Sequence, residues 1–280
     1  MSTSRVSVDF MPTVRQRRIA IELRLLRDGA DLTIEQASEI LNCEPAEMLA
    51  IEECRRPIPP ETLAYLLRYG YRITDREYLR YFYDLAAYGH ERDWTEVYSD
   101  LAPPYRRMYD GLNLAAIGTW AYHPTTFPDR LQTPEYRRAL LPGLETTRAE
   151  QRLRGAEPAQ FWVLLGEPAL RVRVGSDIVM ASQYQRLLAL IDHPDIDLRI
   201  VPMSAAACAR YPQTFVMLDF AVPEGDTGIL CLRHHSRALY LDDPKEIGQY
   251  HSVFHRLVEV ALDPAESAEF LLALLAEIEG

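Results

Sequence analysis

The chain has 280 residues, of which 48% are hydrophobic and 25% charged, as in globular proteins with one large or two ordinary domains. Its formal net charge of −11 argues against a general nucleic-acid-binding protein. No apolar stretch is long enough to span a membrane, the N-terminus lacks an apolar signal core, and the four cysteines are scattered. These features predict a cytoplasmic protein with reduced thiols, no membrane contact, no metal and no cofactor.

Hydrophobic spacing and capping signals predict five short helices in the first domain, at residues 14–27, 34–41, 45–53, 61–69 and 75–88. Capping boxes are expected at Thr33/Gln36 and Thr74/Glu77. In the third helix, Met48 and Leu49 are candidates for an exposed apolar patch that docks another protein. The alternative is that they are core residues, which suits Leu49 and Ile51 better than Met48.

The character of the sequence changes after Gly89. Residues 89–110 are rich in aromatic residues and proline and predict an irregular connector. Beyond it, helices are expected at 134–141, 176–191, 244–261 and 264–278, and strands at 161–165, 196–203, 214–220 and 227–233. The predicted fold is therefore α+β and multidomain, with a five-helix domain (1–88), a connector (89–110) and a mixed α+β domain (111–280) ending in two helices.

The segment LRLLRDGADLTIEQASEILNCEPAEMLAIEECRR (23–56) resembles the helix-turn-helix of the phage-repressor, or Xre, type. The segments LQTPEYRRALL, FWVLLGEPALRVRVG, IDLRIVPMSAAA, FVMLDF, ALYLDDPKEIGQYHSVFHRL and ALDPAES resemble, in the same order, the C-terminal domain of actinobacterial regulators of this type. The resemblance implies a transcriptional regulator, acting as a homodimer on a DNA operator, whose C-terminal domain senses a small-molecule ligand or a protein partner.

The presumed DNA-reading segment carries a negative charge, which disfavours binding to the phosphates of DNA. Between Asp28 and Cys54 there is no Lys or Arg, and there are eight acidic residues: Asp28, Asp31, Glu35, Glu39, Glu44, Glu47, Glu52 and Glu53. The candidate DNA contacts are Arg15, Arg17, Arg18, Glu44, Glu47, Arg55 and Arg56. The other interpretation of the arginines is a solvated helix face.

The second domain departs from the family pattern at several positions. Cys208, Ala209 and Arg210 stand where the family has His-Pro-Gly, Cys231 to Arg233 replace Tyr-x-Glu, and Asp129 replaces a glycine. These changes add cationic and titratable groups, which suit an anionic or carboxylate-bearing ligand. The candidate ligand-binding residues are Trp120, Tyr122, His123, Glu167, Cys208, Arg210, Tyr211, Arg233, His234 and Arg237. The alternatives are surface histidines and core aromatic residues.

Three hypotheses follow. The first is a regulator whose helix-turn-helix binds an operator. The second is a repurposed regulator that no longer binds DNA and acts as an enzyme or binding protein on a small molecule, as in secondary metabolism. It predicts a pocket lined by some of Arg210, Tyr211, Arg233 and His234. The third is a protein–protein module that docks a basic or apolar partner. No catalytic pattern specifies a reaction.

Overall fold

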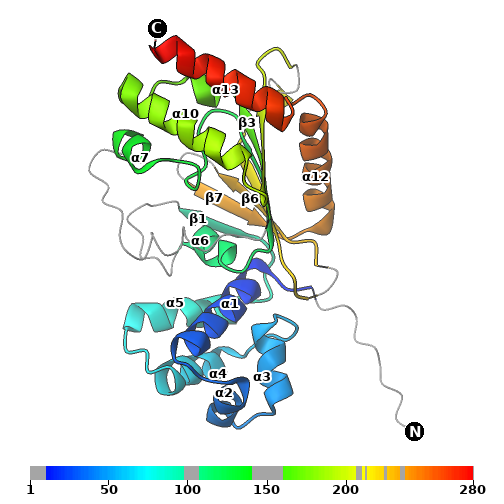
Figure 1. The fold of residues 1–280 in the computed structure, drawn as a ribbon. Coiled ribbons are helices and arrows are strands. Elements are labelled where there is room, and N and C mark those ends of the chain that lie inside the picture. The colour runs from blue at the N-terminus through cyan, green and yellow to red at the C-terminus, as the bar shows by residue number, and fades with distance from the viewer. Residues whose placement is uncertain are drawn as a thin grey trace.

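The computed structural model describes residues 11–97, 107–140, 160–205, 210–211, 213–223, 226–233 and 237–279. It shows the predicted α+β architecture: a helical unit, α1 to α5, followed by a mixed sheet covered by helices on both faces, with two helices at the C-terminal end (Figure 1). We call the part from β1 onward the sheet unit.

The helical unit forms close to the predicted boundaries. Its elements are α1 (Val14–Gly29), α2 (Ile34–Leu41), α3 (Pro45–Glu52), α4 (Pro60–Tyr65), a π-helical turn η1 (Leu66–Gly70) and α5 (Arg76–Ala87). The capping box of Thr33 and Gln36 at α2 is confirmed. The one expected at Thr74 is wrong, because Asp75 caps α5 and accepts from two backbone N–H groups.

The apolar residues of α3 are distributed differently from the prediction. Met48 is fully buried and Ile51 is 5% exposed, whereas Leu49 is 39% exposed. The side chain of Met48 therefore belongs to the core, and Leu49 is the apolar residue that α3 presents to solvent. The assignment of these two neighbours was wrong because an eight-residue helix carries too few apolar positions to fix its buried stripe.

The sheet unit contains seven strands among the described residues, in the order β1-β7-β6-β5-β2-β3-β4. Their bounds are β1 (Trp94–Val97), β2 (Gly118–His123), β3 (Gln160–Gly166), β4 (Ile196–Val201), β5 (Phe215–Asp219), β6 (Ile229–Arg233) and β7 (Arg237–Leu241). Strands β2, β3 and β4 are parallel, and the remaining pairs are antiparallel. Strand β1 lies within the expected connector.

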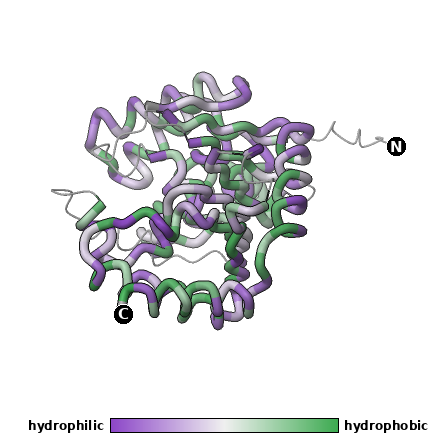
Figure 2. Tube along the Cα trace, turned by 90° about the horizontal axis from the view of Figure 1, so that it is seen from above, coloured by the Kyte–Doolittle hydropathy of each residue, from purple (hydrophilic) through white to green (hydrophobic). Residues whose placement is uncertain are grey.

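The helices of the sheet unit are α6 (Met108–Asn113), α7 (Pro134–Leu140), α9 (Glu167–Arg171), α10 (Asp177–Ile191), α12 (Pro244–Val258) and α13 (Pro264–Glu279). Helix α12 covers one face of the sheet, and α10 and α13 cover the other (Figure 1). Seen from above, hydrophobic positions gather at the centre, and hydrophobic and hydrophilic positions alternate along α13 (Figure 2). Such alternation is expected of a helix with one buried face.

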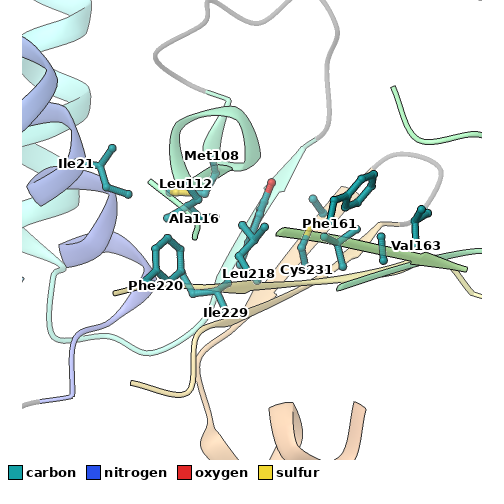
Figure 3. Close-up of a cluster of buried hydrophobic side chains, with 14 of the residues drawn as sticks. Ile21, Met108, Leu112, Ala116, Phe161, Val163, Leu218, Phe220, Ile229 and Cys231 are labelled. Atoms are coloured by element: carbon teal, nitrogen blue, oxygen red, sulfur yellow. The ribbon is translucent and has the colours of Figure 1, made fainter. Parts of the chain in front are cut away.

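Helix α6 joins the two units. Its segment places Met108, Leu112 and Ala116 between Ile21 of α1 and the sheet face around Leu218 (Figure 3). A hydrophobic core therefore continues from the helical unit onto the sheet face opposite α12. Gly111 permits this packing, because a Cβ there would lie 2.2 Å from Nε of Arg18.

Candidate functional site

Arg17 of α1 is an interior residue. Its side chain is 3% exposed, its Nη2 lies 2.5 Å from Oδ2 of Asp226, and its Nη1 donates to the carbonyl of Val222. Its guanidinium also lies 4.3 Å from the ring centroid of Phe220. Both sequence interpretations of this arginine, phosphate contact and solvated helix face, fail because burial removes it from any surface that DNA reaches.

The neighbouring arginines are also engaged. Arg18 is 2% exposed and pairs with Glu22 at 2.7 Å, so the same correction applies to it. Arg15 pairs with Glu91 at 2.8 Å and donates to the carbonyl of Asp93. The N-terminal turns of α1 thus use their positive charges for contacts within the protein.

The surface of α2 and α3 is acidic, and its flanking bases are paired. Arg55 contacts Glu53, and Arg56 lies 2.9 Å from Glu47. Glu44 is exposed at the N-cap of α3 and makes no capping hydrogen bond. Within residues 28–56, both arginines therefore pair with acidic side chains of the same surface.

Several candidate ligand residues lie on the α12 face of the sheet. Trp120 stacks on Trp162 with ring centroids 4.0 Å apart, and its Nε1 donates to Asp219 at 2.7 Å. Tyr122 is fully buried in the same layer. Tyr211 packs beside this layer and accepts from Arg256 of α12, while Arg210 next to it is exposed.

His123 and Arg233 lie on the opposite face. Tyr122, Phe215 and Leu232 stand at one level across β2, β5 and β6, and the next residues at this end of β2 and β6 are His123 and Arg233. Because side chains alternate along strands, both point away from α12, two strands or about 10 Å apart. Tyr211 and Arg233 therefore do not line one pocket together, since the sheet separates them.

His123 has the most unusual environment of the candidates. It is 5% exposed, and its Nδ1 makes no hydrogen bond within the described part of the chain. Burial, with a further contribution from the positive charge of Arg233, lowers the pKa of His123 to about 3. The imidazole is therefore neutral at physiological pH and holds an unused hydrogen-bonding nitrogen beside a cation.

A partly buried polar network from three other elements lies on the same face. Tyr240 of β7 donates to Oε1 of Glu96 on β1 at 2.9 Å, and the N–H of Met108 donates to the other carboxylate oxygen. Burial raises the pKa of Cys231 to about 12, so its thiol is not a nucleophile at neutral pH. Tyr109 of α6 reaches over this network, its ring centroid 6.0 Å from the Arg233 guanidinium.

His123 also stands at the carboxyl end of β2, where β2 and β3 run parallel. Ligands of open α/β sheets commonly bind outside the carboxyl ends of such strands. Gly166 ends β3 here, and a Cβ on it would lie 2.5 Å from the carbonyl oxygen of Pro124. The glycine thus allows the chain that follows His123 to cross close over the end of β3.

Glu167 has a structural role. It accepts from the backbone N–H of Met203 at 2.9 Å and from Nε of Arg171 at 2.5 Å. Burial alone would raise the pKa of its carboxyl, but these two donors lower it below its usual value. The carboxylate therefore ties the start of α9 to the segment after β4.

The remaining candidates do not join the site. Arg237 is exposed at the start of β7. Cys208 and His234 lie outside the described residues. The sequence missed Glu96, Tyr109 and Tyr240, which meet only through the pairing of β1 with β7 and the packing of α6. The family resemblance gave one signal nearby, the replacement of Tyr-x-Glu at Cys231–Arg233.

Lowering the pH from about 7.5 to about 5 is expected to cost about 2 kcal/mol of unfolding free energy through His123. The stability gained by keeping this imidazole neutral is fully present above the unfolded pKa of 6.5 and is lost as the pH falls toward 3. Urea titrations of the wild type and His123→Phe at both pH values measure this. The variant should lose the pH dependence by that amount, and an unchanged dependence contradicts the assignment.

A family model described as a domain of unknown function, DUF5753, matches residues 109–273, from α6 to α13. The chain belongs to the DUF5753 family. The DUF5753 segment contains His123, Arg233 and every strand of the sheet except β1.

Other similarities are distant. No curated protein matches the chain. Among solved structures, Nuc, a phospholipase D family member from Salmonella typhimurium, is 11% identical, with 61% of this chain and 98% of that chain covered and a TM-score of 0.35. The archaeal chromatin protein TrmBL2, whose structure shows a mode of DNA binding, is 10% identical, with 74% and 72% covered and a TM-score of 0.34. At such TM-scores neither likeness supports a conclusion about the DUF5753 chain.

No helix among the described residues is long and apolar enough to cross a membrane.

Proposed function

We propose that this protein is a regulator of the Xre helix-turn-helix type whose sheet unit binds a small anionic ligand beside His123 and Arg233. The observation that carries the proposal is the buried, neutral imidazole of His123, whose Nδ1 has no described hydrogen-bond partner. A buried polar atom without a partner costs free energy, which a ligand atom would recover.

The class of ligand follows from the charges at this end of the sheet. Arg233 supplies a cation within range of His123, and a guanidinium pairs well with a carboxylate. A neutral imidazole donates one N–H, so His123 and Arg233 together suit a carboxylate group rather than a cation. The polar network of Tyr240 and Glu96 fixes β1 and β7 beside the site.

Succinate and citrate, with succinamide as the neutral control, test this site by isothermal titration. Wild-type protein should bind at least one of the acids, and His123→Phe and Arg233→Met should each weaken binding about tenfold or more. His255→Gln, an exposed histidine on α12, is the matched control and should bind as the wild type does. Absence of binding, or binding that both site variants retain, contradicts the proposal.

A second candidate function is a regulator fold that has lost DNA binding and acts on small molecules alone. The specific observation in its favour is the acidic surface of α2 and α3. The two arginines of residues 28–56 are both paired there, Arg55 with Glu53 and Arg56 with Glu47. Such a surface repels phosphate.

A gel-shift experiment with the upstream DNA of its own gene at low salt separates the two candidates. A shift that weakens steeply with added salt supports the DNA-binding regulator. No shift at low ionic strength, where phosphate attraction is strongest, supports the second candidate and excludes operator binding through α3.

A further inference from the structure

A pocket of about 290 Å³ lies within the helical unit, away from His123. Its walls come from α1, the end of α3, the segment between α3 and α4, and the end of α5. Ile19 and Ala20 of α1, Ile51 of α3 and Ala86 of α5 give it an apolar lining. Pockets for small molecules are typically apolar with a few placed polar groups, and this volume is near the lower end of their usual range.

The wall opposite α1 is stiff. Pro57, Pro59 and Pro60 line the pocket, and each proline has a fixed backbone φ. Ile58 between them is 6% exposed, so this segment is anchored in the core. The pocket is therefore preformed, and a ligand would not have to order the segment when it binds.

The pocket has three polar lining residues, of which Gln16 accepts a hydrogen bond from the backbone N–H of Thr13 through its Oε1. Arg56 and His90 line it, and both are exposed, so they stand where the pocket opens to solvent. The guanidinium of Arg56 lies 2.9 Å from Glu47 of α3. Arg56 at the mouth of the pocket therefore already pairs with a carboxylate.

From this geometry we propose a binding site for a small molecule with an apolar body and one carboxylate. The apolar body occupies the space between Ile19, Ile51 and Ala86, and the carboxylate replaces Glu47 at Arg56. Because exposed ion pairs contribute little stability, the exchange costs little. Glu47 then loses its cation, so ligand binding at this site makes the exposed surface of α3 more negative.

Benzoate, octanoate and indole-3-acetate are suitable probes, with their primary amides as neutral controls. We expect at least one acid to bind the full-length protein in isothermal titration. Ala86→Leu fills the pocket and should abolish binding, and Arg56→Gln should weaken it about tenfold. Ala87→Leu on the same helix and Arg55→Gln next to Arg56 are matched controls that should leave the affinity unchanged.

Isothermal titration and the thermal stability of each variant together test the site. Ala86→Leu protein that unfolds at the wild-type temperature and no longer binds supports the site. Absence of binding by all three acids overturns it, as does equal binding of acids and amides or binding that Ala86→Leu retains. If the wild-type protein is a dimer in solution and Ala86→Leu makes it a monomer, a second copy of the chain fills the pocket and the proposal is overturned.

Discussion

Replacing Arg17 with Met is expected to lower the unfolding free energy by about 3–5 kcal/mol, because removal of one partner leaves the other buried charge uncompensated. The side chains of Arg17 and Asp226 are each 3% exposed, and burial already raises the pKa of the Asp226 carboxyl. Without Arg17, that carboxylate would have to take up a proton or open the loop to water.

Chemical unfolding of three proteins tests this expectation. Arg24→Met on the exposed face of the same helix is the matched control, and its stability should stay within about 0.5 kcal/mol of the wild type. The double variant Arg17→Met/Asp226→Asn should recover part of the loss, since no buried charge remains. A loss of less than about 1 kcal/mol in Arg17→Met, at a pH where Asp226 is ionised, would contradict a buried pair.

The defect of Arg17→Met should also depend on pH. A carboxyl whose folded pKa is raised stabilises the protein when protonated, and this contribution is lost as the pH rises through the folded pKa. Because Arg17 lowers the pKa of Asp226, its removal raises that pKa further. The difference between variant and wild type should therefore grow from acidic to neutral pH.

Replacing Gly166 with Ala is expected to destabilise the protein by about 3 kcal/mol, at the upper end of overpacking effects. The added Cβ would lie 2.5 Å from the carbonyl oxygen and 2.8 Å from Cα of Pro124. These are backbone atoms, so no side-chain rotation relieves the contact. Pro124 follows His123 directly, so the displaced backbone would also move the imidazole of the proposed ligand site.

Thermal unfolding and succinate titration of Gly166→Ala measure both effects. Gly248→Ala on α12 is the matched control, because its Cβ would meet nothing within 4 Å. In an exposed helical position this change should stabilise the protein by about 0.5–1 kcal/mol. Wild-type stability of Gly166→Ala would show that the crossing over β3 is looser than the structure indicates.

Most of the helices, though not α6 and α9, and several strands could be predicted because their signals are local. The periodicity of α1, the capping box of α2 and the proline at the start of α3 gave boundaries within two residues. Strand β2 was missed because it is buried on both faces, which removes the alternation that marks a strand. Strand β1 has four residues, too few for any pattern.

The site was predictable only in part. His123 and Arg233 were singled out from the sequence, but Arg210 and Tyr211 were grouped with them by nearness along the chain. Which face of the sheet a side chain occupies depends on register, and a single residue of shift reverses it. The arginines of α1 were assigned to the surface because that is where most arginines lie. No local pattern in the sequence indicates that Arg17 pairs with the distant carboxylate of Asp226.

Strand β1 has a practical consequence for any fragment cut at the family boundary. A fragment beginning at residue 109 would keep β7 but lose β1, Trp94 to Val97. The backbone N–H and C=O groups that β7 pairs with β1 would then have no partner strand. Unpaired strand edges recruit other chains, so such a fragment is prone to aggregate or to pair edge to edge. The hydroxyl of Tyr240 would also lose its hydrogen-bond acceptor, Glu96. A fragment of this protein that keeps the β1–β7 pairing therefore has to start before Trp94.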